Sequence, residues 1–399
     1  MTRFDPAAPV LCAGRRTAIG TTGHAFAGVD VIGLSAPVLA AVARHAAALD
    51  RPIDDVVLGN CMGPGGDIAR VAALAAGLGE TVPGVTVDRQ CGSGLDAVLQ
   101  AAARVRSGDA ELVLAGGAES ASTAPWRFWP GAPGRDPVRY TRAPFTPAGE
   151  PDPDMGEAAD LLAAKLGITR ADQDRYAARS HALTHAAAIA GRYTAEIVPL
   201  PELSADQRPR PGLDERRLAR LRPAFGADGT VTAGNSCGVS DGAAALAVTT
   251  AGAARAAGLP YLRVVGSAVA AGRPDLPGLA PAPAVRRLLA RTGVGLADVG
   301  AVEITEAFAS VVLAVVDELG LDQDRVCAEG GAIGLGHPWG ASGAILLLRL
   351  MSRLLDPAEA VEAAGATGPT GPTGSGLGLA ACAIGGGQGL AMLLAHPEA

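Results

Sequence analysis

The sequence predicts an α/β protein in which one structural unit occurs twice. Apolar, β-branched segments alternate with alanine- and leucine-rich segments of helical spacing, a pattern typical of parallel strands joined by helices. A glycine-rich turn that ends in Ser-Gly and opens a helix occurs around residue 93 and again around residue 342. Each turn is followed later by a strand that ends in glycines, which an internal duplication explains. A chain of 399 residues has room for two such halves.

The best-defined helix of the first half begins just after Cys91. An apolar run from Val85 to Val87 leads toward this cysteine, glycines follow it, and Ser107-Gly108-Asp109 supplies a stop signal. Cys91 is therefore expected on a strand-to-helix turn. Around it we expect a short strand and then a turn at 14–20 within residues 8–20, a helix at 30–48, a strand at 54–60, a helix at 68–78 and a strand at 111–115.

The second half repeats this order of elements. Its glycine-rich turn at residues 330–343 opens a helix, as the turn at Cys91 does. A stretch rich in Gly, Thr and Pro at 365–378 indicates a flexible surface insertion. The elements expected here are strands at 262–269, 301–304 and 379–384 and helices at 282–289, 309–319 and 344–354.

The segment between the halves has a different composition. Residues 120–155 are rich in proline, arginine and aromatic side chains and predict a long loop, which is either functional or a covering or subunit-contact loop. Helices are expected at 156–166 and 170–191. Six arginines lie between residues 208 and 222. They fit a phosphate-binding cluster or, because acidic residues are interspersed, a solvated helix face.

Charge and cysteine usage exclude several classes of function. The net charge of −7 argues against general binding to nucleic acids or anionic membranes. The N-terminus shows no leader pattern and no apolar run reaches membrane-spanning length, so we expect a cytoplasmic protein. The six cysteines lack the paired spacing of metal ligands, so we expect reduced thiols and neither a disulfide framework nor a metal site.

Cys91 is the candidate nucleophile. The amides and dipole at a helix N-terminus favour a thiolate, so we expect a lowered thiol pKa. Gly92 and Gly94 leave room for an acyl group and its carrier close to the backbone. The alternative is an inert buried cysteine.

His337 is the candidate base for this thiol. It stands in a glycine-rich turn, and if the two halves pack about a pseudo-twofold axis, the turn at His337 meets the turn at Cys91. The alternative is a histidine of a surface loop. The glycines at 385–387 offer backbone amides for a developing oxyanion.

Taken together, these motifs resemble the thiolase family over the whole length of the chain. The match is carried by Cys91-Gly92-Ser93-Gly94, the stretch from Ala115 to Ser120, Met155-Gly156, the stretch from Gly229 to Asn235, Glu306-Ala307-Phe308, the stretch from Gly336 to Gly343 and the stretch from Ile384 to Gly389.

The resemblance implies a duplicated five-layered α/β/α/β/α thiolase fold with an inserted loop domain, assembled as a homodimer or homotetramer. It places an N-terminal half at 1–119 plus 241–263, a loop domain that binds coenzyme A at 120–240, and a C-terminal half at 264–399. It also implies a ping-pong reaction on acyl-CoA, with no permanently bound cofactor, in which Cys91 carries the acyl group and His337 activates the thiol. The residues expected to contact coenzyme A or the acyl group are Arg210, Asn235, Cys237, Met155 and Gly385.

The chain departs from the family pattern at positions that matter for the chemistry. Thr305 stands where the family has the asparagine that orders a water of one oxyanion hole. Ala383 occupies the place of the second catalytic cysteine, the acid/base of the carbon–carbon step. Cys382 lies one residue earlier, which on a strand means the opposite face unless a bulge intervenes. Cys237 and Asp154 replace an expected serine and, in many members, a histidine.

Three functions follow as hypotheses. The first is a thiolase-type acyltransferase that performs 3-ketoacyl-CoA thiolysis or Claisen condensation, with Cys382 and Thr305 in altered versions of the family's roles. The second keeps the acyl-Cys91 intermediate but transfers the acyl group to an amine, an alcohol or a carrier thioester. The third is a non-catalytic subunit that binds acyl-CoA.

Overall fold

The computed structural model describes residues 4–355 and 376–399, and its framework is one sheet built from both halves of the chain. The first half contributes β1 (Pro9–Thr17), β3 (Asp55–Gly59), β4 (Gly84–Val87), β5 (Leu112–Ser120) and β9 (Ser240–Thr250). The second half contributes β10 (Tyr261–Ala271), β11 (Ala301–Ile304), β12 (Leu377–Ile384) and β13 (Gln388–Ala395). Their spatial order is β11-β12-β13-β10-β1-β9-β5-β3-β4, with the short β2 (Gly20–Thr21) beside β9 and β8 (Ile197–Val198) beside β1.

The sheet is mixed, so the expectation of a parallel sheet is wrong for most neighbours. Only β3 with β4 and β5, β11 with β12, and β8 with β1 pair in parallel. A short glycine turn joins β12 to β13, and such a turn can connect only antiparallel strands. Antiparallel pairing of β1 with β10, at Val10 opposite Arg263, joins the two halves. The strand β1 also continues through Thr17, where a turn is expected from the sequence.

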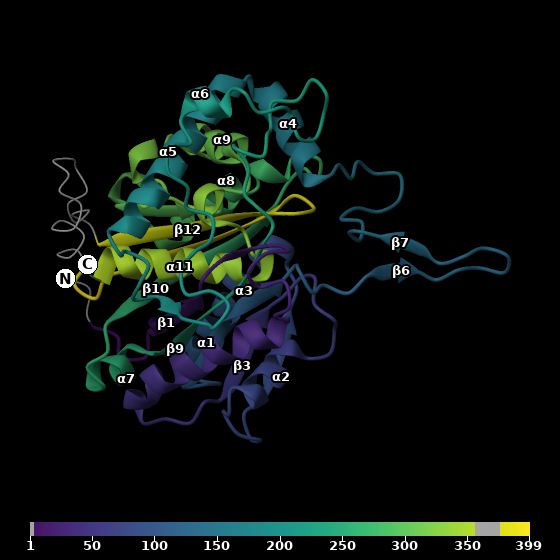
Figure 1. Cartoon of the computed structure of the whole chain (residues 1–399). Helices are drawn as coiled ribbons and strands as arrows, with labels where there is room; N and C mark the ends of the chain where they lie inside the picture. The colour runs from purple at the N-terminus through teal and green to yellow at the C-terminus, as the bar shows by residue number, and fades with distance from the viewer. Residues whose placement is uncertain (1–3, 356–375) are drawn as a thin grey trace.

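Helices divide the molecule into five layers. The helices are α1 (Val31–Ala46), α2 (Ile68–Ala75) and α7 (Ala251–Ala256) outside the first half, α3 (Ser93–Ser107) and α11 (Trp339–Leu355) in the centre, and α8 (Pro281–Thr292) and α9 (Ala309–Leu319) outside the second half. One apolar cluster unites α3 and α11 with the inner faces of both sheet halves, and separate clusters lie under the outer helices. The central helices α3 and α11 lie between the two sheet halves in Figure 1. The predicted α/β fold is confirmed.

The helix α1 shows how local sequence sets these elements. Asp30 accepts a hydrogen bond from the Gly33 amide at 2.8 Å and so caps the N-terminus. Leu34, Val38 and Val42 lie on its buried face against the sheet. The segment Val31–Leu49 is the one described segment that is long and apolar enough to span a membrane, contrary to the expectation from the sequence. Its apolar face packs against the sheet, as expected for a helix of the protein core.

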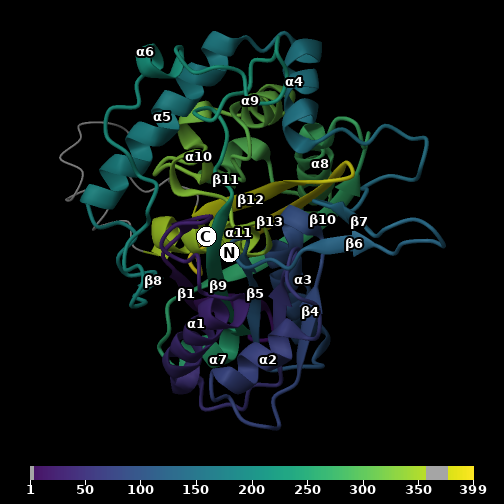
Figure 2. The same ribbon diagram turned by 45° about the vertical axis from the view of Figure 1, so that its right-hand side comes forward.

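The segment between β5 and β9, where the loop domain is expected, lies over the second half (Figure 2). It contains α4 (Met155–Leu166), α5 (Arg170–Ile189) and the short α6 (Glu215–Leu218), and both α4 and α5 pack against α9. The buried carboxylate of Glu306 anchors this segment to the second half. It accepts hydrogen bonds from two side chains of α5, Tyr176 Oη at 2.7 Å and Ser180 Oγ at 2.6 Å. Within the predicted long loop, β6 (Arg127–Trp129) and β7 (Val138–Tyr140) form a hairpin that projects from the body (Figure 1).

One boundary expected from the sequence falls inside an observed strand. The strand β10 begins at Tyr261, so a domain boundary after residue 263 falls inside it. The Gly-, Thr- and Pro-rich insertion expected at 365–378 lies mostly outside the described residues.

A buried ionic cluster connects the three parts of the chain. The Glu196 carboxylate accepts hydrogen bonds from Arg16 Nε at 2.7 Å and from Ser352 Oγ at 2.8 Å. It also forms an ion pair with the Arg349 guanidinium. Both arginines are almost fully buried. Arg16 comes from β1, Glu196 from the loop domain and Arg349 from α11, so the cluster holds these parts together.

Replacement of Glu196 by alanine is expected to lower the free energy of unfolding by about 1–3 kcal/mol, because two buried cations lose a shared counter-charge. Arg16 keeps its pair with Asp206 and Arg349 keeps its pair with Glu329. Urea unfolding followed by circular dichroism measures this change. The matched control is Glu318→Ala, which removes an exposed pair with Arg286 and is expected to cost about 1 kcal/mol or less. Equal losses in the two variants would contradict a special role for the cluster.

Candidate active site

Cys91 lies on a tight turn directly before α3. The residues Gln90–Gly92 form one turn of 3₁₀ helix, and Gln90 has a positive φ of 46°, which is strained for a non-glycine residue. The Ser93 hydroxyl stabilises the turn by accepting from the Arg89 amide at 2.8 Å and donating to the Gln90 carbonyl at 2.6 Å. The turn leaves Cys91 only partly buried. A strand-to-helix turn is what the sequence predicts here.

The structure brings the two glycine-rich turns together. A Cβ atom added to Gly94 would lie 2.6 Å from the carbonyl oxygen of Gly340, and one added to Gly343 would overlap the backbone of Leu95. Glycine is needed at these positions because the first turns of α3 and α11 touch through their backbones. The Glu119 carboxylate fixes the contact, since it accepts from the amides of Gly340 and Cys61, each at 3.1 Å.

His337 is buried and firmly oriented. Its amide donates to the Gly238 carbonyl at 3.0 Å, and its Nδ1 lies 2.6 Å from Ser342 Oγ. Nε2 is buried and has no hydrogen-bond partner in the described part of the chain. Burial lowers the pKa of His337 to about 4, so the ring is neutral at pH 7. A neutral imidazole whose Nδ1–H donates to Ser342 keeps a free lone pair on Nε2.

The expected lowering of the Cys91 pKa is wrong. Burial raises the pKa of this thiol well above its ordinary value, and the neighbouring Cys382 and Cys237 thiols add to the increase. The cost of desolvating a thiolate outweighs the favourable amides of the turn. Free Cys91 is therefore a neutral thiol at pH 7, and a base must remove its proton during attack.

Cys382 and Ala383 lie on opposite faces of β12. The Cys382 side chain is fully buried among the central helices, where Sγ contacts the carbonyl oxygens of Cys91 and Ala383, each at 3.3 Å. Thr305 follows β11 in register with Cys382 and is also buried. Burial raises the pKa of Cys382 to about 12, and the Thr305 hydroxyl acts against this shift. The placement argues against Cys382 as an acid/base that meets substrate.

The other face of β12 borders an apolar region beside the turn at 385–387. Ala383 belongs there to one apolar cluster with Phe308, and Met155 packs against this cluster. The Phe145 ring covers Gly385, since a Cβ there would lie 2.6 Å from the ring. The Arg142 guanidinium lies 4.6 Å from the centre of the Phe145 ring. The long loop thus closes over the predicted oxyanion amides.

The remaining residues that are expected to contact coenzyme A differ in burial and in hydrogen bonding. Asn235 is fully buried, with its side chain bonded to the Thr232 amide at 2.8 Å and to Asp174 at 3.0 Å, so it supports the loop rather than meeting a ligand. Cys237 is partly buried, and its amide donates to the Ala307 carbonyl at 2.9 Å. Arg210 is exposed.

Sequence reasoning missed Arg208, Phe145, Ser342 and Glu119 as individual residues. Arg208 packs against Gly238 and Gly336, the residues next to Cys237 and His337. The only available signal was its membership of the arginine cluster. Ser342 could have been found, because it stands in the repeated Ser-Gly turn five residues after His337.

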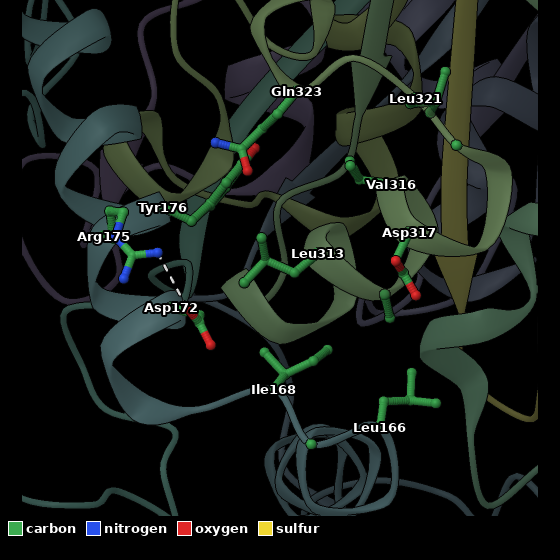
Figure 3. Close-up of a pocket in the computed structure, with 13 residues that line it drawn as sticks. Leu166, Ile168, Asp172, Arg175, Tyr176, Leu313, Val316, Asp317, Leu321 and Gln323 are labelled. Atoms are coloured by element: carbon green, nitrogen blue, oxygen red, sulfur yellow. Dashed lines mark hydrogen bonds and ion pairs between the residues drawn. The ribbon is translucent and has the colours of Figure 1, made fainter.

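A separate pocket lies away from these residues. It has a volume of about 600 Å³ and is lined by the end of α4, the start of α5 and one face of α9 (Figure 3). Apolar side chains such as Leu166, Ile168 and Leu313 line it, with the Arg175–Asp172 pair at its rim. None of the predicted site residues lines it. Within residues 4–355 and 376–399, no group of three or more metal-ligating side chains occurs.

Comparisons with known proteins give a consistent result. The family model described as thiolase, N-terminal domain, matches residues 10–252, and the thiolase C-terminal domain matches residues 259–396. A putative acetyl-CoA C-acetyltransferase of Bacillus subtilis is 41% identical over 90% of this chain and 91% of its own length. The acetyl-CoA acetyltransferase of Escherichia coli is 39% identical, with 96% and 98% covered.

Two further relatives extend the comparison. The beta-ketoadipyl-CoA thiolase of Pseudomonas knackmussii is 42% identical, with 86% of this chain and 92% of that protein covered. The crystal structure of the Bacillus anthracis acetyl-CoA acetyltransferase superposes with a TM-score of 0.87 at 35% identity and covers 98% of both chains. The chain has the thiolase fold and belongs to the thiolase family, as an acyltransferase of the thiolase type.

Proposed function

We propose that this acyltransferase forms an acyl-Cys91 intermediate from acyl-CoA and uses it in 3-ketoacyl-CoA thiolysis or the reverse Claisen condensation. The observation that carries the proposal is the contact between the first turns of α3 and α11, which brings the segment of Cys91 against the segment that follows His337. This contact supports the proposal that the Cys91 thiol and the neutral imidazole of His337, which come from different halves, act in one site.

In the proposed acylation, Nε2 of His337 removes the Cys91 proton while sulfur attacks the thioester carbonyl. The Nδ1 contact with Ser342 holds the ring in position. The developing oxyanion is stabilised by amides of the turn at Gly385. Coenzyme A leaves after it regains the proton from His337.

Coenzyme A itself is expected to enter beside the loop domain. Arg210 is exposed and free to meet a phosphate group. Cys237 and Met155 are both partly buried and are proposed to meet the pantetheine and acyl groups. Asn235 supports this loop from within. We propose a loop domain at 120–240 between two halves. The expected division into 1–119 plus 241–263 and 264–399 is changed at one point, since the second half begins with β10 at Tyr261.

A second function is favoured by one observation, the alanine at position 383. Without a thiol on that face of β12, the enzyme acylates Cys91 and passes the acyl group to an amine, an alcohol or a carrier thioester. The amine and the alcohol react at nitrogen or oxygen and require no carbon acid. The measured fate of the acyl group decides between this function and carbon–carbon chemistry.

The test is acylation of the wild-type protein by acetyl-CoA. Intact mass spectrometry is expected to show one acetyl adduct, and peptide mapping is expected to place it on Cys91. Acetoacetyl-CoA and free coenzyme A are then added, and loss of the ketoester enolate absorbance measures thiolysis. Acylation without thiolysis would select the second function, and no adduct with any acyl-CoA would overturn both.

We also propose a cytoplasmic homodimer or homotetramer. The β6–β7 hairpin supports association, because Trp126, Phe128 and Val138 are exposed on an element that projects from the body. Light scattering of the wild type and of a variant with these three residues changed to serine measures the contribution of the hairpin.

A further inference from the structure

We propose that Cys237, assisted by the guanidinium of Arg208, is the acid/base that exchanges a proton with the α-carbon of the second acyl-CoA. The proposal rests on the acyl-Cys91 reaction above and names the group that completes it. Carbon–carbon bond formation needs such a group, because a thioester α-proton is not lost without a base.

The two positions where a second thiol is expected do not supply it. Ala383 carries no acid/base group and borders the apolar region beside Phe308. Cys382 is fully buried on the opposite face of the strand, and its sulfur contacts two backbone carbonyls. A substrate carbon cannot reach that sulfur unless β12 separates from the central helices.

Cys237 lies between the two segments that surround the reaction. Its amide donates to the Ala307 carbonyl at 2.9 Å, and the next carbonyl, that of Gly238, accepts from the His337 amide at 3.0 Å. Cys91 and Cys237 are the only two of the six cysteines that are not fully buried, and all six lie in the described residues. Cys237 is also close enough to Cys91 to raise the pKa of the Cys91 thiol.

Arg208 gives this thiol a cationic neighbour. Its guanidinium packs directly over Gly238, where any Cβ would overlap Nη1, and its Cδ lies beside Gly336. It makes no hydrogen bond or ion pair with another residue of the described chain, and Nε is buried without a partner. Burial raises the pKa of Cys237 to about 12, and Arg208 acts against this increase. An unpaired cation beside a thiol favours the thiolate form that removes a proton.

The proton balance closes without an added reactant. The Cys237 thiol first loses its proton to solvent, and the resulting thiolate, which Arg208 stabilises, takes the α-proton. The C–H electron pair becomes the enolate. The enolate carbon attacks the acyl-Cys91 carbonyl, a carbon–carbon bond forms, and the carbon–sulfur bond to Cys91 breaks. The proton held by Cys237 then returns to the Cys91 thiolate. In thiolysis the Cys237 thiol protonates the departing enolate.

The test is exchange of the methyl protons of acetyl-CoA in D₂O, measured by mass spectrometry beside acetylation of Cys91. In the Cys237→Ser variant, exchange is expected to fall by about 10²- to 10⁴-fold relative to acetylation of the same variant, whereas an equal fall in both rates would contradict the assignment. Cys12→Ala, which removes a buried thiol of β1, is the matched control and is expected to retain both rates.

The competing assignment is Cys382→Ser. Loss of exchange in that variant with exchange retained in Cys237→Ser would overturn the proposal. Absence of exchange in an acylated wild-type enzyme would overturn it as well, while leaving acyl transfer from Cys91 intact. Absence of the acetyl adduct in the wild type would instead overturn the proposed function.

Arg208→Gln supplies a readout that a purely structural role would not change. Loss of the cation raises the pKa of the Cys237 thiol, so the thiolate fraction at a fixed pH falls and the exchange rate is expected to fall with it. Acetylation of Cys91 at the same pH serves as the internal reference. An unchanged ratio of exchange to acetylation would contradict the assignment of Arg208.

Discussion

Replacement of Cys91 by alanine is expected to abolish acyl transfer, with kcat/KM for thiolysis falling by at least about 10⁴-fold. The variant has no sulfur to carry the acyl group, and the buried Cys382 thiol cannot take over because both of its contacts are backbone carbonyls. Steady-state thiolysis of acetoacetyl-CoA and intact mass after acetyl-CoA treatment measure the loss.

Cys12→Ala is the control for loss of a thiol as such, and it is expected to keep wild-type turnover. The melting temperature of Cys91→Ala is expected to remain near that of the wild type, because this side chain is only partly buried. An acetyl adduct that persists in Cys91→Ala would place the nucleophile elsewhere.

Replacement of His337 by alanine is expected to lower the rate of acylation by about 10²- to 10⁴-fold at pH 7. Because burial raises the pKa of Cys91, hardly any thiolate exists without a base that accepts the proton during attack. Stopped-flow release of coenzyme A under single-turnover conditions measures acylation directly. A decrease of less than tenfold would assign the proton transfer to another group.

The pH profile gives an independent check on His337. Its pKa is lowered to about 4, and only the neutral ring accepts a proton. The wild-type acylation rate is therefore expected to be level near neutrality and to fall as the pH decreases through about 4 in the folded enzyme. In His337→Ala this acidic limb is expected to disappear.

The sequence predicts best where a local pattern decides the structure. The helix after Cys91 is confirmed from Ser93 to Ser107, and Gly108 ends it with a φ of 81°. The strict two-residue period of a strand likewise suffices to separate the faces of Cys382 and Ala383. Neither result depends on distant parts of the chain.

Features that depend on distant contacts could not be predicted. The pKa of Cys91 follows from burial and from Cys237 and Cys382, which lie far away in the sequence. The Glu196 carboxylate binds Arg16, which lies 180 positions earlier in the sequence, and Arg349, which lies 153 positions later. Arg208 could not be told apart from five neighbouring arginines, because its contact with Gly238 exists only after folding.

The backbone contact between Gly94 and Gly340 has a consequence for how this molecule can change over time. In the proposed reaction, each repeat supplies one member of the reacting pair, so neither repeat alone would be active. A bulkier residue at either glycine would push the repeats apart, and no substitution on the opposite side could restore the lost proximity. The outer surfaces of the two repeats can therefore change independently. The residues at the contact between the repeats, such as Gly94 and Gly340, cannot change independently.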